Sequence, residues 1–202
     1  MNSDSENRRP RGRPPVDDKR RKILDAALEA FARRGYHGVT MPELAAAAGL
    51  GAGTVYRTFT DKQDLVNHVF RDAKARLAAA LGAPPTASDP RGSFLEAWGR
   101  LVAFARAEPL AFQFLELQDH TPYLDAESRQ LELAVLMPLW LAGQGLAAGG
   151  ALRELPVEVG IAMVWGSLVG LIKAERLGYL RLDDAAFTAA GEACWAALAK
   201  PT

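Results

Sequence analysis

The stretch from Thr40 to Lys62 constrains the fold most, because it carries a helix start, a helix stop and a second helix start in close succession. Thr40 and Glu43 form a capping-box pattern, in which the hydroxyl accepts from the amide three residues on and the carboxylate reaches back. Gly49 ends that helix, since the left-handed backbone after a helix favours glycine. A second short helix is expected over residues 52–59. The segment therefore predicts a helix-turn-helix, the unit that places a helix in the major groove of DNA.

The flanking segments predict further helices. Residues 17–34 carry apolar side chains at helical spacing, and Gly35 ends that helix. Thr60 and Gln63 predict another capping box, opening a helix that runs to about residue 81. The stretch 82–88 then breaks the pattern and is the strongest internal boundary.

Two other interpretations of the glycine-rich turn were weighed. Gly49, Gly51 and Gly53 suggest a phosphate-binding loop, but the dinucleotide fingerprint needs a glycine where this chain has Thr54, and it needs a preceding strand. A helical hairpin with no role on DNA would explain the caps and the glycines. It would not explain the polar outward side chains, Arg57 among them, next to basic flanks.

A set of residues from 40 to 65 resembles the N-terminal signature of the TetR family of transcriptional regulators, and the resemblance covers roughly residues 20–66. Gly51 and Ala52 depart from it, because the family usually has a Ser or Thr cap followed by a residue that is often polar. The set consists of Thr40, Leu44, Ala45, Ala48, Gly49, Gly53, Thr54, Val55, Tyr56, Phe59, Lys62 and Leu65.

The resemblance implies an all-α fold of about nine helices. A basic arm over residues 1–15 would precede a DNA-binding domain over 16–62 and a helical ligand-binding and dimerisation domain over 63–202. It also implies a one-component regulator without cofactor or enzymatic activity. Such a repressor binds a palindromic double-stranded operator as a homodimer and leaves it when a small apolar or aromatic effector binds.

Charge is distributed unevenly in a way that fits this division. Hydrophobic residues make up 49% of the chain and charged residues 24%, which is typical of a soluble globular protein. Residues 1–80 hold 15 Lys and Arg against 10 Asp and Glu, whereas residues 81–202 hold 9 against 14. A basic front half joined to an acidic back half suggests a nucleic-acid-binding module attached to something else.

The chain is expected to be cytoplasmic, with no membrane partner. It begins without the apolar core of a signal peptide, and no apolar stretch was judged long enough to span a bilayer. The single Cys194 fits a reducing compartment. His37, His68 and His120 show no metal-ligand spacing, so no metal site is expected.

Contacts to DNA are expected from two places. In the second helix of the unit, Gly53 allows close backbone approach and Tyr56 donates to phosphate. Thr54 and Arg57 point at phosphates or base edges, and Arg57 is the leading candidate for reading a base. Thr40 and Lys62 lie at helix N-termini, which favour phosphate. In the arm, Arg11 and Arg13 belong to an Arg-Gly-Arg-Pro run suited to a narrow A·T-rich minor groove.

The later helices, expected over about 89–107, 109–118, 125–148 with an interruption near Pro138, 156–178 and 183–199, hold all four tryptophans. Aromatic walls with a few polar anchors suit an apolar ligand, although most of these residues are expected in the core. The ligand candidates are Trp98, Phe112, Gln113, Glu116, His120, Trp140 and Trp165.

The 156–178 helix is apolar over more than one face, so it is either central core or a subunit interface. Its Gly166 and Gly170 are four residues apart, a spacing that lets two helices approach closely. The family resemblance favours the interface, with Trp165 and Val169 beside the two glycines.

Two other functions were considered beside the regulator. One is a helical enzyme with an accessory helix-turn-helix, which lacks any recognised catalytic motif in this chain. The other is an architectural DNA-binding protein that takes no ligand.

Overall fold

A computed structural model describes residues 16–82 and 86–201. Within those ranges nine α helices form and no strand, so the all-α prediction is confirmed; one isolated bridge joins Leu152 to Ala199. The helices are α1 (Val16–Arg34), α2 (Met41–Ala47), α3 (Ala52–Thr58), α4 (Lys62–Leu81), α5 (Pro90–Ala107), α6 (Pro109–Leu117), α7 (Ala126–Ala148), α8 (Val157–Arg176) and α9 (Asp184–Leu198).

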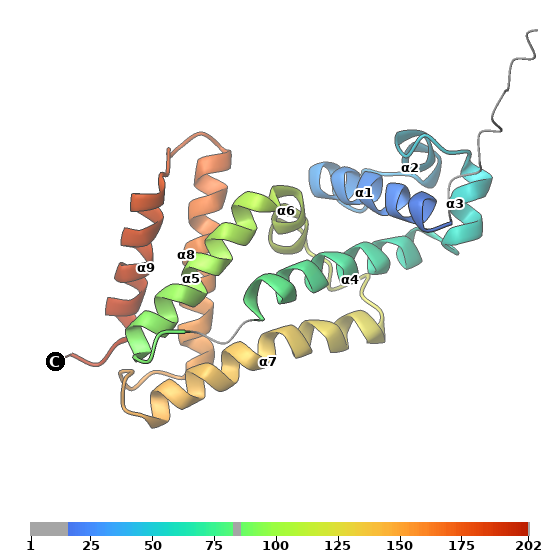
Figure 1. The fold of residues 1–202 in the computed structure, drawn as a ribbon. Helices are drawn as coiled ribbons and strands as arrows, with labels where there is room; N and C mark the ends of the chain where they lie inside the picture. The colour runs from blue at the N-terminus through green and yellow to red at the C-terminus, as the bar shows by residue number, and fades with distance from the viewer. Residues whose placement is uncertain (1–15, 83–85, 202) are drawn as a thin grey trace, which may run out of the picture.

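The helices are arranged between two ends (Figure 1). Helices α1, α2 and α3 form one end, and α5, α8 and α9 form the other. Helix α4 leaves the first end and runs beside α7, while α6 lies between α1 and α5. The two ends are therefore joined by continuous helix as well as by packing.

The helix-turn-helix forms as its caps predict. The Thr40 side chain accepts from the Glu43 amide and the Glu43 carboxylate accepts from the Thr40 amide, so the capping box is present. Gly49 has a φ of 67°, the left-handed conformation that stops α2. Gly51 is the N-cap of α3 and offers no side-chain cap.

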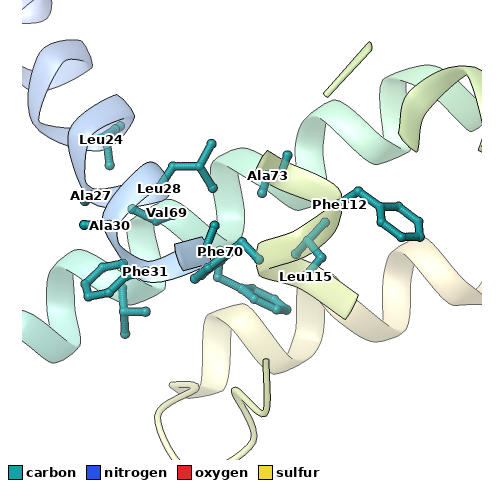
Figure 2. Packing of buried hydrophobic residues seen from close by; sticks show 14 of the residues in the cluster. Leu24, Ala27, Leu28, Ala30, Phe31, Val69, Phe70, Ala73, Phe112 and Leu115 are labelled. Carbon is teal, nitrogen blue, oxygen red and sulfur yellow. The ribbon is translucent and has the colours of Figure 1, made fainter. Parts of the chain in front are cut away.

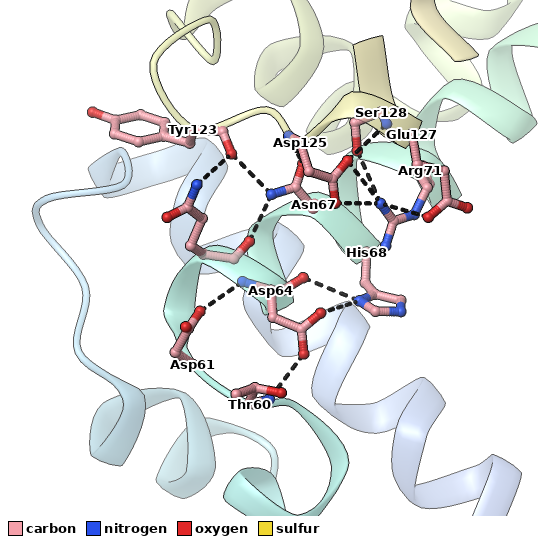
Figure 3. Close-up of polar contacts among 11 residues, drawn as sticks. Thr60, Asp61, Asp64, Asn67, His68, Arg71, Tyr123, Asp125, Glu127 and Ser128 are labelled. Atoms are coloured by element: carbon pink, nitrogen blue, oxygen red, sulfur yellow. Dashed lines mark hydrogen bonds and ion pairs between the residues drawn. The ribbon is translucent and has the colours of Figure 1, made fainter. Parts of the chain in front are cut away.

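Helix α4 begins differently from the prediction. Its N-cap is Asp61, whose carboxylate accepts from the Asp64 amide at 2.8 Å. The Asp64 side chain reaches back to the Thr60 amide at 2.8 Å, and Figure 3 shows both contacts. The predicted Thr60–Gln63 capping box is therefore wrong. Aspartate is a strong N-cap residue, and Asp61 has Asp64 three residues on to close the turn.

Helix α7 also differs, because it continues through Pro138 without the expected interruption. A proline within a helix removes the hydrogen bond to the carbonyl four residues earlier. Both Pro138 and Ala134 are exposed, so the carbonyl left without that partner lies on the solvent side. Water can satisfy it there, and the helix persists.

The core joins the two ends of the molecule. Figure 2 shows Leu28 and Phe31 of α1 beside Phe70 of α4, with Leu115 of α6 nearby. Phe31 is 1% exposed, and its ring lies 6.3 Å from that of Phe114 on α6. Helix α1 is thus packed directly on α4 and α6, and α2 packs in turn on α1.

Helices α7 and α8 are each long and apolar enough to cross a membrane by length and composition, which corrects the expectation that no such stretch exists. Little of either apolar window is buried, 6% in α7 and 17% in α8. Their outer faces therefore expose apolar side chains, including Leu133 and Leu141 on α7 and Val159 and Met163 on α8.

Helix α9 meets α5 at a site of close approach. A Cβ added to Gly191 would lie 2.6 Å from Cδ1 of Trp98, whose indole N–H donates to the carbonyl of Phe187 at 2.8 Å. The Trp98 ring thus occupies the space that a side chain at position 191 would need.

Replacing Gly191 with alanine should destabilise the protein by about 1–3 kcal/mol, because the buried Trp98 ring must move. Gly99→Ala on the exposed face of α5 is the matched control, since no atom lies within 4 Å of its added Cβ. That change should stabilise by up to about 1 kcal/mol through helix propensity. Urea unfolding followed by tryptophan fluorescence measures both, and equal stability of Gly191→Ala and wild type would contradict the prediction.

Candidate DNA-binding and ligand sites

Helix α3 has one anchored face and one free face. Val55 is 0% exposed, and Phe59, the C-cap residue of α3, is 1% exposed, so both fix the helix to the core. On the opposite side Tyr56 is 51% exposed, and Gly53 and Arg57 are also exposed. This combination holds a short helix rigidly while offering polar side chains outward.

The predicted contact residues of α3 interact with one another. An Nη of Arg57 donates to the hydroxyl of Thr54 at 3.1 Å, and the Thr58 hydroxyl donates to the Thr54 carbonyl at 3.0 Å. The space around Gly53 is open to 4 Å. The Arg57 guanidinium keeps further N–H donors for a partner, since it has five in all.

Thr40 is engaged by its own helix. Its hydroxyl lies 2.7 Å from Oε2 of Glu43, and an Nη of Arg34 lies 3.0 Å from the other carboxylate oxygen. The hydrogen bond from the Thr40 side chain, then that from its amide and the contact with Arg34, hold the pKa of Glu43 below its usual range. Glu43 is therefore a carboxylate at neutral pH beside the predicted phosphate site.

Lys62 is turned toward the loop between α1 and α2. Its ammonium donates to the carbonyls of Tyr36 and Val39, at 3.0 Å each, and lies 4.2 Å from the centre of the Tyr36 ring. The side chain is half-buried. This geometry gives Lys62 a positioning role for the loop ahead of α2, whereas its predicted contact with phosphate stays a prediction.

Lys62→Met should lower stability by about 1.5–3 kcal/mol, because two carbonyls lose a charged donor. Lys22→Met, which removes only an exposed ion pair with Asp18, should change stability by less than about 1 kcal/mol. Chemical denaturation provides the comparison. If Lys62→Met instead keeps full stability and lowers the salt dependence of DNA binding by about one charge, Lys62 contacts phosphate rather than the loop.

Tyr123, in the segment between α6 and α7, joins the two ends of the molecule at a point that the sequence did not indicate. Its ring stacks on Tyr36 with centroids 3.9 Å apart, and its hydroxyl lies 2.8 Å from Nε2 of His37. Its carbonyl accepts from the side-chain amides of Gln63 at 3.2 Å and Asn67 at 2.9 Å (Figure 3).

The same segment is tied to α4 by further polar contacts (Figure 3). The Asn67 side-chain oxygen accepts from the Asp125 amide at 2.9 Å, and an Nη of Arg71 lies 2.9 Å from an Asp125 carboxylate oxygen. Asn67 is 1% exposed, among the buried and mostly apolar residues of α4. A buried amide at that position was the available signal, since such a group requires partners.

An apolar cavity of about 140 Å³ lies among α5, α7, α8 and α9. Apolar cavities of about 150 Å³ accept ligands the size of benzene. The cavity is lined by Phe94, Ala97, Trp98, Leu101, Leu139, Ala142, Gly143, Leu146, Leu152, Arg153, Leu155, Pro156, Val157, Gly160, Ile161, Val164, Trp165, Trp195 and Leu198.

Two of the predicted ligand residues, Trp98 and Trp165, line this cavity, and the other five do not. Phe112 and Gln113 line a different cleft beside Ile172, and the Gln113 amide donates to the carbonyl of Ala32 at 2.6 Å. Phe94 and Trp195 also line the cavity, although the sequence did not single them out as ligand candidates. Their regular spacing does not reveal that they border empty space.

The remaining candidates have protein partners. His120 is buried, its Nε2 contacts the carbonyl of Phe114, and burial lowers the pKa of its imidazole. It borders a cleft next to Tyr123. The Trp140 indole donates to a Glu158 carboxylate oxygen at 2.7 Å.

Glu116 lies one side chain behind the cavity wall. Its Oε2 accepts from the indole N–H of Trp165 at 2.5 Å. Its Oε1 is buried and has no hydrogen-bond partner among the described residues. Burial raises the pKa of this carboxyl group, while the Trp165 hydrogen bond and the charge of Lys74 act in the opposite direction.

The predicted interface residues on α8 divide between two faces. Gly166 and Gly170 are exposed, with no atom within 4 Å of an added Cβ. Trp165 and Val169 are half-buried and pack against the core. Of the four predicted interface residues, the two glycines therefore lie on the face of α8 that is open to a second helix, and Trp165 and Val169 do not.

Two predictions concern other parts of the chain. Arg11 and Arg13 lie outside the described residues. Within the part of the chain that the structure covers, no group of three or more His, Cys, Asp or Glu residues is placed to hold a metal ion.

Comparison with known families agrees with this geometry. The profile described as "Bacterial regulatory proteins, tetR family" matches residues 23–69, and the one described as "Tetracyclin repressor-like, C-terminal domain" matches residues 70–200. The chain belongs to the TetR family. It is therefore a transcriptional regulator, with a helix-turn-helix DNA-binding domain and a C-terminal ligand-binding domain, rather than an enzyme.

Two curated relatives match over about a quarter to a third of this chain. The "HTH-type transcriptional repressor KstR2" of Rhodococcus jostii is 36% identical over 64 residues, covering 29% of this chain and 31% of that protein. The "Fatty acid metabolism regulator protein" of Bacillus subtilis is 37% identical over 51 residues, covering 25% of this chain and 26% of that protein. The chain thus spans about a third or less of the length of each.

Solved structures match over nearly the whole chain. A TetR-family regulator from Marinobacter aquaeolei has a TM-score of 0.81 at 22% identity, covering 92% of this chain and 97% of that one. A putative TetR-family regulator from Shewanella has a TM-score of 0.77 at 26% identity, covering 91% and 99%. TetR-family transcription factors are soluble DNA-binding proteins, so the apolar faces of α7 and α8 fit packing against protein.

Proposed function

We propose that this regulator is a cytoplasmic repressor that binds a palindromic operator as a homodimer and releases it when a small apolar ligand fills the cavity. The observation that carries the proposal is α3, which exposes Gly53, Tyr56 and Arg57 while buried Val55 and Phe59 fix its other face. A rigid helix with a free polar face is what entry into the major groove requires.

Base reading falls to few side chains, because Gly51 and Ala52 carry almost none at the start of α3. Arg57 is the residue with the reach and the donors for a guanine, whereas Thr54 and Tyr56 suit phosphate. Thr40 and Lys62 act first by shaping the unit, through the cap on α2 and the loop before it. Arg11 and Arg13 are proposed to follow a neighbouring minor groove.

Arg57→Ala should weaken operator binding by about 1–3 kcal/mol and relax the preference at one base pair. Arg181→Ala is a matched loss of one exposed arginine, in the loop between α8 and α9. It should leave operator affinity unchanged. Fluorescence anisotropy at fixed salt, on operator and single-base variants, makes the measurement. Unchanged affinity and preference in Arg57→Ala would remove this residue from the interface.

A single helix-turn-helix buries too little surface for tight operator binding, so two copies must act together. Their α3 helices must reach successive major grooves, about 34–36 Å apart or a multiple of that distance. The open glycine face of α8, with Met163 and Val159 exposed beside it, supports this helix as the contact between copies.

Gly170→Leu should obstruct the approach of the two α8 helices and yield a monomer with little operator affinity. Gly99→Leu, at an exposed and open glycine of α5, is the control and should remain dimeric. Sedimentation velocity reports the assembly state. A Gly170→Leu protein that stays dimeric, with wild-type operator affinity, would place the interface elsewhere.

Coupling between the cavity and DNA is supported by contacts that begin at the cavity wall. Trp165 binds Glu116 on α6, and the amides of Gln113 and Gln118 donate to the Ala32 carbonyl near the end of α1 at 2.6 and 3.3 Å. Helix α4 provides the second connection. A typical coupling free energy of about 1–3 kcal/mol acts equally in both directions, so operator DNA should weaken ligand binding by the same factor.

The ligand class is proposed from the cavity rather than from the relatives. The B. subtilis relative named as a fatty acid metabolism regulator matches over only 25% of this chain. The cavity wall, in contrast, is almost wholly apolar and includes three tryptophans.

A further inference from the structure

We propose that the cavity ligand is an apolar molecule carrying one positive charge, a hydrophobic ammonium, which lies against the Trp165 indole and is balanced by the Glu116 carboxylate. The inference rests on the proposed function in one respect, that the cavity binds a small molecule. It adds the charge of that molecule and the residues that select it.

The first observation is the state of Glu116. Its Oε1 is buried without a partner among the described residues, and its Oε2 is held by the Trp165 N–H at 2.5 Å. Buried polar atoms nearly always have a partner, so one that lacks it calls for an explanation. A cationic ligand would supply the missing balance for a carboxylate in apolar surroundings.

The neighbouring charges do not provide that balance. Lys74 on α4 is 5% exposed, but its ammonium lies 3.5 Å from Oε1 of Glu132 on α7. His120 stays uncharged at neutral pH, because burial lowers the pKa of its imidazole. Lys74 is therefore already paired with Glu132, and it does not by itself balance the Glu116 carboxylate when that group is ionised.

The second observation is the cavity wall. Trp98, Trp165, Trp195 and Phe94 line a space with almost no polar surface. The faces of aromatic rings attract cations, and tryptophan does so most strongly. The aromatic rings can thus stabilise an ammonium group in this space even where one of its N–H groups has no hydrogen-bond acceptor. A carboxylate gains no such stabilisation from the ring faces.

The cavity lining holds one charged side chain, Arg153, which is bound to the end of α9. Arg153 is exposed, and its guanidinium donates to the carbonyls of Ala196 at 3.2 Å and Ala199 at 3.3 Å. It is thus engaged at the C-terminal end of α9, where a cation is favoured by the helix dipole.

Trp165 connects the two observations, because one face of the residue borders the cavity and its N–H contacts Glu116. A cation over the ring is attracted by the ring and by the carboxylate behind it. In a medium of low dielectric both attractions are stronger than in water. Glu116 is accordingly a specificity-determining residue that acts through Trp165.

The test compares three probes of one shape: benzylamine, benzyl alcohol and benzoate. Binding to the full-length protein is measured at neutral pH by quenching of tryptophan fluorescence and by thermal shift. Benzylamine should bind about tenfold more tightly than benzyl alcohol, the effect of a desolvated cation–π contact, and benzoate should bind more weakly than either.

Glu116→Gln should reduce benzylamine affinity to that of benzyl alcohol and leave the alcohol unaffected. Trp165→Phe keeps an aromatic ring but removes the N–H, so it should also reduce the preference for benzylamine over benzyl alcohol. Glu158→Gln is the matched control, because Glu158 also accepts from an indole, that of Trp140, but neither residue lines the cavity. It should retain the full preference.

The pH dependence gives a separate readout. Protonation of Glu116 removes its charge, so benzylamine affinity should fall as the pH is lowered through the raised pKa of this group, while benzyl alcohol affinity stays constant. Glu116 faces Trp165 of α8, Lys74 of α4, Glu132 of α7 and, through that cluster, His120. In the Glu116→Gln protein, benzylamine affinity should not fall as the pH is lowered. That result would assign the pH dependence to Glu116 rather than to those neighbours.

The outcomes distinguish this inference from the proposed function. If benzyl alcohol binds as tightly as benzylamine, or if Glu116→Gln keeps the preference for the amine, the cavity is a ligand site but the charge assignment is wrong. If none of the three probes binds the wild-type protein, the cavity is not a ligand site of this size, and both proposals fail together.

Discussion

The packing of α1 against α4 and α6 is the contact on which the rest of the structure depends. Phe31 of α1 is almost fully buried, and its ring packs against that of Phe114 on α6. Burying an aromatic side chain of this size contributes a few kcal/mol to stability, so α1 and the helix-turn-helix that packs on it cannot rotate freely on α4. The position of α3 is therefore set by α6 as well as by the helix that follows it. Any ligand that acts on DNA binding must change this packing.

Polar contacts make the same junction specific. The Tyr123 ring and hydroxyl contact Tyr36 and His37 in the α1–α2 loop, while its carbonyl binds Gln63 and Asn67 on α4. Lys62 then ties α4 to the same loop. Apolar packing alone tolerates small shifts of one helix over another, whereas hydrogen bonds to fixed carbonyls require one register. The segment between α6 and α7, which belongs to the C-terminal domain, thus helps to fix the position of the helix-turn-helix.

How much the sequence could predict follows the range of the interactions involved. The α2 cap, the stop at Gly49 and the inward and outward faces of α3 depend on residues within one or two turns, and the structure has them as expected. The start of α4 was placed one residue early because Thr60 and Asp61 are both good caps. The cavity was harder. Trp98 and Trp165 were named, but Phe112 and Gln113 lie at another cleft, since helical periodicity says which face is apolar and not which neighbour leaves space.

The position of α6 explains how a small cavity far along the chain can affect α3. On this short helix, Glu116 contacts Trp165 at the cavity and Gln113 contacts Ala32 on α1. The two contacting residues are less than two turns of helix apart. A ligand has effect only if it binds one arrangement of these helices better than another. In the inference proposed above, the discriminating contact is the Trp165 hydrogen bond to Glu116, because it joins the cavity wall to α6. A cation held against the indole is attracted by the carboxylate behind it, so in that proposal the charge of the ligand acts on α6 through this contact.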